Sequence, residues 1–271
     1  MTNTLSLDLT KEVPLLHDPV NWVIHAAGKA HTLPRNKREE EEFFQCNVRG
    51  TENLFRGLER SAQLPRGIVF ISSVAVYGVD SGTDIVESKP LHGNSAYSES
   101  KIVAETVAKD WGSKHNVNVA ILRLPLVAGP HPPGNLGAMI RAIRKGYYFR
   151  INQGIARRSV VLASDLGSIL PQALAHGGTY NLTDGLHPTF FELEELIRSQ
   201  IGKRKILNIS TRGAKLLATA GDGINLIFPG KSPFDSEKFR KITNSLTFSD
   251  TAAREKLNWQ PTPVIHGWKI E

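Results

Sequence analysis

The 271-residue sequence has one cysteine, no long apolar run and no visible secretory signal. A single thiol, Cys46, excludes an intrachain disulfide and a cysteine metal cluster. No apolar stretch reaches the roughly 18 residues that a membrane-spanning helix needs. The N-terminus, MTNTLSLDLTKEV, lacks the basic and apolar regions of a secretory signal. These absences predict a cytoplasmic protein without a membrane span.

The charge balance is basic, with 33 Lys and Arg against 26 Asp and Glu and a net charge of +7. The densest basic groups are short: Arg141/Arg144/Lys145, Arg157/Arg158 and Lys203/Arg204/Lys205. No zinc-finger or RNA-binding signature accompanies them. We therefore predict a solvated basic surface with a phosphate pocket, and no nucleic-acid partner. The acidic run Glu39 to Glu42 is interpreted as a solvated helix face, so no metal site is predicted.

Short apolar runs alternate with helical patterns in the first half of the chain. This order is typical of an α/β fold with a Rossmann-like, doubly wound parallel sheet. The expected strands are Leu5 to Leu9, Trp22 to Ala26, Gly67 to Ser72 and Val117 to Leu124, and the expected helices are Arg35 to Ala62 and Ser95 to His115. The apolar runs GIVFISS and VNVAILRL suit strands that are covered on both faces.

A Pro/Gly-rich stretch, GPHPPGNLG, follows the last of these strands and marks a boundary near residue 130. We predict a cofactor-binding domain over 1–130 and a smaller α/β substrate subdomain over 131–271, with some segments returning to the large sheet. The later expected helices are Leu136 to Lys145, Ser164 to Ala175, Thr189 to Ile201 and Arg212 to Leu226, and the strands are Ser159 to Leu162 and Thr179 to Leu182. The helix around Lys215 to Ile227 is amphipathic, which suits a partner or membrane surface but is explained more simply by a core-facing helix.

Two segments carry candidate chemistry. Tyr97 and Lys101 are four residues apart at the start of an expected helix, so the phenol and the amine share one face. A nearby cation favours the phenolate, which a tyrosine with a pKa of about 10 needs to act as a base. Ser72 and Ser73 end an apolar strand, at the sheet edge where such folds bind ligands. The alternatives are a surface Tyr/Lys pair and serines that cap the strand end.

In their order along the chain, these segments resemble the extended short-chain dehydrogenase/reductase family, in its nucleotide-sugar epimerase/dehydratase branch. The segments that carry the resemblance are LSLDLT, VIHAAGKAH, CNVRGTENL, Ser73 with Tyr77-Gly78, Tyr97 with Lys101, LRLPLVAGP, RSVVLASD and KLNWQP. The resemblance implies that Ser73, Tyr97 and Lys101 are the catalytic residues. It implies NAD as cofactor, with NADP left open, and a homodimer that pairs through a bundle including the Tyr97 helix.

The resemblance also implies the binding residues. Those for the cofactor are Asp8, His25, Ala26, Ala27, Lys29, Asn47, Ser72, Tyr97, Lys101 and Leu124, and those for a nucleotide-diphosphate sugar are Ser73, Asn135 and Arg158. Arg158, seven residues before Asp165, corresponds to an arginine that grips the diphosphate, and a guanidinium suits phosphate oxygens. Asn47 corresponds to a structural asparagine.

The sequence departs from the family pattern in two places. No G-x-x-G-x-x-G turn occurs near the N-terminus, so the phosphate cradle is missing. A truncated or mis-started gene product is the favoured explanation, and the alternatives are another segment or subunit that fills the gap and a degenerate member of the family. Loss of that unit is expected to expose apolar faces and unpaired backbone on neighbouring strands. The second departure is that Val74 and Ala75 replace the Asp-Glu pair of sugar dehydratases, so dehydration is disfavoured.

The function expected from these features is that of an NAD(P)-dependent nucleotide-sugar oxidoreductase, closest to a UDP-sugar 4-epimerase of polysaccharide precursor synthesis. A 4-ketosugar reductase uses the same three residues and stays open as an alternative. A non-catalytic or truncated nucleotide-sugar-binding member of the family is the second alternative.

Overall fold

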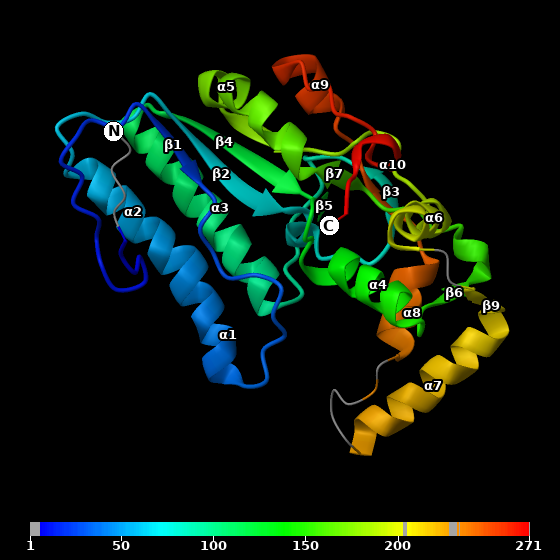
Figure 1. Cartoon of the computed structure of the whole chain (residues 1–271). Helices are drawn as coiled ribbons and strands as arrows, with labels where there is room; N and C mark the ends of the chain where they lie inside the picture. Colours follow the sequence, from blue (N-terminus) through cyan, green and yellow to red (C-terminus); the bar gives the residue numbers. More distant parts are fainter. Residues whose placement is uncertain (1–5, 203–204, 228–231, 233, 271) are drawn as a thin grey trace.

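A four-stranded parallel sheet forms the centre of the N-terminal part of the molecule (Figure 1). The computed structural model describes residues 6–202, 205–227, 232 and 234–270. The strand order is β1-β2-β4-β8, and these strands span Trp22–His25, Gly67–Ser73, Asn118–Leu124 and Gly178–Asn181. Because all neighbours are parallel, the carboxyl ends of the strands meet at one edge, where ligands bind in open α/β sheets.

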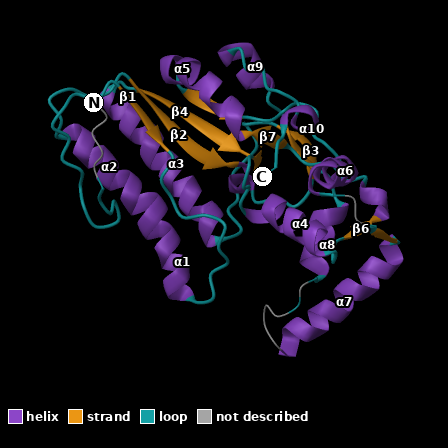
Figure 2. Ribbon diagram, viewed as in Figure 1, coloured by secondary structure: helices purple, strands orange, loops and turns teal. Residues whose placement is uncertain are grey.

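Helices lie on both faces of this sheet (Figure 2). They are α1 Lys37–Phe44, α2 Gly50–Glu59 and α3 Ala96–His115 on one side and α5 Leu166–His176 on the other. Ile68 and Phe70 of β2 pack with the α2 and α3 side chains, whereas Val69 packs in the core below α5. Successive side chains of a strand point to opposite faces, and both faces of β2 are covered, so its residues from Ile68 to Ile71 are all apolar.

The sequence at its two ends determines where α3 begins and ends. Ser95 and Ser98 form a capping box, in which each side chain accepts the backbone N–H of the other residue. Asn116 ends the helix in the left-handed conformation at φ 53°. The Ser95 cap therefore places Tyr97 in the first turn of α3.

Shorter sheets and helices make up most of the C-terminal part. Parallel pairs form between β5 and β7, β6 and β9, and β3 and β10. These strands span Gly82–Ile85 (β3), Leu126–Ala128 (β5), Phe149–Ile151 (β6), Val160–Leu162 (β7), Leu207–Ile209 (β9) and Leu246–Phe248 (β10). The helices span Gly134–Lys145 (α4), Phe190–Ile201 (α6), Thr211–Ile227 (α7), Ser236–Thr243 (α8), Thr251–Leu257 (α9) and Val264–Gly267 (α10). A second apolar core joins α4, α6 and β7, while β8 returns to the large sheet.

The expected α/β class with a parallel sheet is confirmed, but the strand expected at Leu5 to Leu9 is wrong over the described residues. The Asp8 carbonyl oxygen accepts the N–H groups of Lys11 and Glu12, and its carboxylate accepts the Thr10 N–H at 3.0 Å. An aspartate that bonds the backbone two residues further on stabilises a turn. This segment is therefore a turn beside α2, where Asn53 donates to the Leu9 carbonyl oxygen at 2.8 Å.

β1 is an edge strand among the described residues, because it pairs with β2 alone. Trp22 and Ile24 are 47% and 50% exposed, whereas Ile68 and Val69 on β2 are fully buried. The apolar side chains of β1 are therefore only half covered by the described residues. None of the described helices is long and apolar enough to cross a membrane.

Candidate active site

The end of β2 and the first turn of α3 bring two hydroxyl groups together. Ser73 ends β2, and its Oγ accepts the Ala75 N–H at 3.2 Å, which caps the short 3₁₀ helix Val74–Tyr77. Tyr97 is partly buried in the first turn of α3. Burial raises the pKa of Tyr97, and a hydrogen bond with the Ser73 hydroxyl acts in the opposite direction. Ser73 therefore caps the strand end and also faces the phenol.

Lys101 lies one helical turn after Tyr97 and is almost fully buried. Its Nζ donates to the carbonyl oxygen of Ile71 at 2.7 Å and lies 4.1 Å from the centroid of the Phe70 ring. Burial lowers the pKa of Lys101 to about 8, and the carboxylate of Glu105 partly offsets this shift. The ammonium is therefore bonded to β2, which explains why the pKa of Tyr97 is raised by burial rather than lowered as the spacing predicted.

His25 lies at the carboxyl end of β1 and is buried, with 4% of its surface exposed. Its Nε2 lies 2.9 Å from Thr51 Oγ1, which itself donates to the Asn47 carbonyl oxygen at 2.6 Å. Thr51 thus accepts from His25, so the neutral ring carries its proton on Nε2. Burial, followed by the charge of Lys101, lowers the pKa of His25 to about 4.

This pKa predicts an acid-sensitive fold. Between pH 6.5 and about 4 the unfolded chain binds a proton at His25 that the folded chain does not bind, so stability falls as the pH falls through this window. The loss amounts to about 3 kcal/mol in the free energy of unfolding. We expect His25→Gln, which keeps an N–H for Thr51, to remove most of this loss when urea unfolding is compared at pH 7 and pH 4. His17→Gln, at an exposed histidine, is the control, and an unchanged pH dependence in His25→Gln would contradict the assignment.

Asn47 connects the loop after β1 to α3. It lies in a π-helical turn, Gln45–Arg49, that separates α1 from α2 within the helix expected from Arg35 to Ala62. Its Oδ1 accepts the Lys29 N–H at 2.7 Å, and its Nδ2 donates to Ser100 Oγ at 2.9 Å. Ser100 in turn donates to the Tyr97 carbonyl oxygen at 2.8 Å. The asparagine thereby fixes the β1 loop relative to the turn that carries Tyr97.

A buried polar network lies behind this edge of the sheet, and the sequence analysis did not identify it. Glu105 accepts from Ser72 Oγ at 2.6 Å and from Arg123 Nε and Nη2 at 3.1 and 2.7 Å. Arg123 also donates to the Tyr77 hydroxyl at 3.0 Å, which donates to Asn181 at 2.8 Å. Arg123 lies within an apolar strand, and Glu105 lies on the helix that carries Tyr97. Charged residues are rarely buried unless they are paired, so these two positions could have indicated the network from the sequence.

The remaining residues expected to bind the cofactor have different surroundings. Ser72 is directed to Glu105, and the Leu124 side chain packs in the core below α5. Ala26 and Ala27 are exposed after β1, while Lys29 forms an ion pair with Glu42. Asp8 is exposed in its turn, and hydrogen bonds from Thr10 lower its pKa.

The two further substrate residues lie in the C-terminal part. The guanidinium of Arg158 donates to the carbonyl oxygens of Arg157, Lys241 and Asn244 and stacks 5.0 Å from the Phe190 ring centroid. Burial lowers the pKa of Arg158 to about 10, with Asp80 acting in the opposite direction. In this arrangement Arg158 holds the end of α8. Asn135 is exposed in the first turn of α4.

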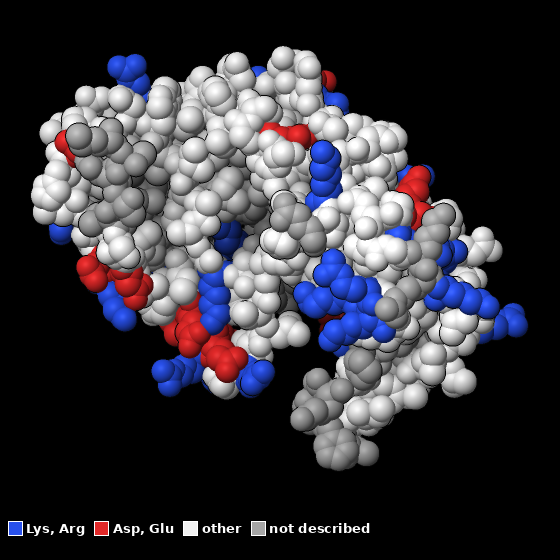
Figure 3. Space-filling view, viewed as in Figure 1, with Lys and Arg blue, Asp and Glu red and all other residues white. Residues whose placement is uncertain are grey.

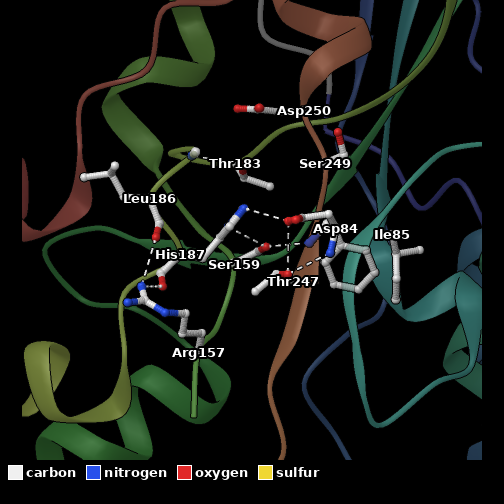
Figure 4. Close-up of polar contacts among 12 residues, drawn as sticks. Asp84, Ile85, Arg157, Ser159, Thr183, Leu186, His187, Thr247, Ser249 and Asp250 are labelled. Carbon is white, nitrogen blue, oxygen red and sulfur yellow. Dashed lines mark hydrogen bonds and ion pairs between the residues drawn. The ribbon is translucent and has the colours of Figure 1, made fainter. Parts of the chain in front are cut away.

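A second polar cluster joins β3, β7 and β10 (Figure 4). Ser159 Oγ lies 3.0 Å from His187 Nδ1, and His187 Nε2 lies 3.6 Å from Asp84 Oδ1. This order of groups resembles a serine hydrolase triad, but Ser159 is 2% exposed and its Oγ accepts the Phe248 N–H at 2.8 Å. The hydroxyl cannot reach a substrate, so the cluster holds the small sheets together.

Comparison with known proteins identifies one matching family model. The model described as the NAD dependent epimerase/dehydratase family matches residues 3–183. UDP-glucose 4-epimerase GEPI48 of Cyamopsis tetragonoloba is 25% identical over 260 residues, which are 88% of this chain and 68% of the relative. GDP-6-deoxy-D-mannose reductase of Pseudomonas aeruginosa is 27% identical over 206 residues, 70% of this chain and 64% of the relative.

The match extends to solved structures. RMD from Pseudomonas aeruginosa, complexed with NADPH, superposes with a TM-score of 0.71 at 20% identity, over 98% of this chain and 85% of that chain. This similarity supports the fold. In two further relatives, the segment that matches this chain covers 50% and 28% of the relative's own length.

Proposed function

The chain belongs to the NAD-dependent epimerase/dehydratase family, and on this premise we propose that it is an NAD(P)-dependent UDP-sugar 4-epimerase. The observation that supports the proposal most strongly is the Ser73 and Tyr97 hydroxyl pair at the carboxyl end of β2, with the buried Lys101 ammonium one turn along α3. The two hydroxyls meet where the sugar hydroxyl of a substrate would have to lose a proton, and the cation lies one helical turn away, bonded to the Ile71 carbonyl oxygen.

Each of the three side chains has a separate task. Tyr97, as the phenolate, accepts the proton of the sugar 4-hydroxyl and later returns it. Ser73 hydrogen-bonds the same sugar oxygen and, in its contact with Tyr97, favours the phenolate. Lys101 supplies the positive charge that stabilises the phenolate once its amine leaves the Ile71 carbonyl oxygen. Bound NAD supplies the acceptor and donor of the hydride.

The fit of the site to NAD(P) is partial. The exposed backbone of Ala26 and Ala27 and the polar groups of Ser73, Tyr97 and Lys101 suit the nicotinamide end. The diphosphate has no Gly-rich cradle near the N-terminus of these 271 residues, and Lys29 is paired with Glu42. The affinity for the cofactor is therefore the property on which the proposal depends.

A 4-ketosugar reductase is the second candidate, favoured by the similarity to GDP-6-deoxy-D-mannose reductase over 70% of this chain. A reductase would use the same proton donor, Tyr97. It would transfer one hydride from the cofactor to the sugar and would not return it to the cofactor. Val74 and Ala75 follow Ser73, so the chain lacks a carboxylate pair for dehydration there.

The two candidates differ in what they consume. We expect the chain with NAD to interconvert UDP-glucose and UDP-galactose, or their N-acetyl forms, without net change in absorbance at 340 nm when the products are followed by NMR. Stoichiometric loss of NADPH absorbance with a 4-keto sugar nucleotide instead favours the reductase. A folded chain that binds sugar nucleotides but produces neither result contradicts both candidates and leaves a binding protein.

We also propose a homodimer in the cytoplasm. A groove of about 360 Å³ runs between α2 and α3, and Phe55 and Trp111 form its apolar floor between charged margins that include Glu59 and Lys114. A bundle of α2 and α3 with the same helices of a second copy would cover this groove.

A further inference from the structure

Helix α7 packs on the molecule through its smallest residues. Ala214 and Ala218 are fully buried, and a Cβ added to Gly221 would lie 1.8 Å from the Phe234 carbonyl oxygen. These positions are three or four residues apart, so they form one face of the helix. Because these residues have almost no side chain, this face of α7 lies close to neighbouring backbone, such as the Phe234 carbonyl oxygen.

The large apolar side chains of α7 point away from the molecule. Leu216, Leu217 and Ile224 are 74%, 50% and 47% exposed. A surface helix normally buries its leucine stripe and exposes its polar face, so this helix has the reverse arrangement. The simpler expectation from the sequence, a core-facing helix, is wrong for these side chains. In Figure 1 α7 projects from the lower edge of the C-terminal part.

The sequence on both sides of α7 is also basic. Residues 203–241 contain nine Lys and Arg and three Asp and Glu, which gives +6 of the chain's net charge of +7. Arg212 and Lys215 are exposed in the first turns of α7. Figure 3 shows Lys and Arg gathered over α4 and α8, next to the largely uncharged surface along α7.

We propose that α7 is an interfacial helix that lies on an anionic lipid bilayer, with Leu216, Leu217 and Ile224 in the boundary between headgroups and acyl chains. A helix with leucines on one face and neighbouring cations binds such a surface through apolar burial together with attraction to anionic lipids. A second copy of this chain is a poorer occupant, because it would bring the same exposed cations, Arg212 and Lys215, to the contact. The proposal rests on α7 and its surroundings and is independent of the proposed enzymatic activity.

Vesicle co-sedimentation of the full chain tests this proposal. We expect binding to vesicles of phosphatidylcholine with 30% phosphatidylglycerol, and at least tenfold weaker binding to pure phosphatidylcholine or in 0.5 M salt. Leu217→Ser with Ile224→Ser is expected to raise the half-saturating lipid concentration at least tenfold, and Arg212→Gln with Lys215→Gln several-fold. The matched control is Leu15→Ser with Leu33→Ser, which removes two apolar side chains elsewhere that are more exposed than Leu217 and Ile224, at 62% and 89% exposure.

Three results would overturn the proposal. One is a chain that sediments no more with anionic vesicles than alone. Another is that the α7 variants weaken binding to the anionic vesicles no more than the control variant does. The third is a dimer in sedimentation velocity that Leu217→Ser with Ile224→Ser converts to monomer while vesicle binding is absent, because the apolar face would then serve self-association.

Discussion

Tyr97→Phe is expected to lower kcat for UDP-sugar interconversion by at least about 10²-fold, the scale of general acid-base catalysis. The substitution removes one oxygen atom and leaves the ring that contacts Phe43, whose centroid lies 6.1 Å away. Folding should therefore be preserved. The Ser73 hydroxyl would lose its partner but keep its bond to the Ala75 N–H.

The expected signature separates chemistry from binding. Because the phenol acts on the transferred proton, the dissociation constants for NADH and the sugar nucleotide should change less than threefold while kcat falls. Tyr147→Phe, at a tyrosine that is 61% exposed, is the matched control and should retain wild-type turnover. Turnover of Tyr97→Phe within threefold of the wild type would eliminate Tyr97 as the base.

Glu105→Ala is expected to destabilise the fold by about 3–5 kcal/mol, the cost of leaving one partner of a buried ion pair uncompensated. Glu105 and Arg123 are 1% and 3% exposed at their side chains, and two hydrogen bonds join them. Loss of the carboxylate also leaves the Ser72 hydroxyl without its acceptor. In a chain of this size the change corresponds to a fall in Tm of roughly 10 °C.

A double variant distinguishes the ion pair from simple loss of packing. Glu105→Leu combined with Arg123→Met removes both charges, so its destabilisation should be at least about 1 kcal/mol smaller than the sum of the single substitutions. Urea unfolding of the four proteins measures this coupling. Additive effects would show that the two side chains do not stabilise the fold as a pair. Asp110→Ala, on the solvent side of α3, controls for helix propensity.

The features that the sequence predicted correctly are those encoded by local patterns. The apolar strand Gly67–Ser73 and the helix Ala96–His115 follow from residue periodicity and from the Ser95 cap, so the placement of Tyr97 beside the strand end followed as well. The spacing of Tyr97 and Lys101 defined their shared face. It contained no information on the carbonyl oxygen of Ile71, which belongs to another element and holds the amine.

The features that could not be predicted depend on contacts between distant segments. The Glu105 and Arg123 pair needs the register of β4 against α3, and Arg158 meets the end of α8 through residues 83 and 86 positions away. The misassigned strand at Asp8 shows the reverse effect, because an apolar pattern gave way to a local aspartate turn. The sequence left the outward face of α7 open and favoured a core-facing helix, because amphipathicity does not say which face of a helix is covered.

Titration of the 271-residue chain with NADH, followed by the fluorescence of the cofactor, tests most directly whether these residues hold the hydride carrier. Our account predicts saturable binding with a dissociation constant in the micromolar range, competed by NAD, and retained in Tyr97→Phe. A chain that is folded by circular dichroism and thermal unfolding, yet shows no saturable binding of NADH or NADPH, would contradict the account. Without a bound cofactor, Ser73, Tyr97 and Lys101 could not support hydride transfer in this chain.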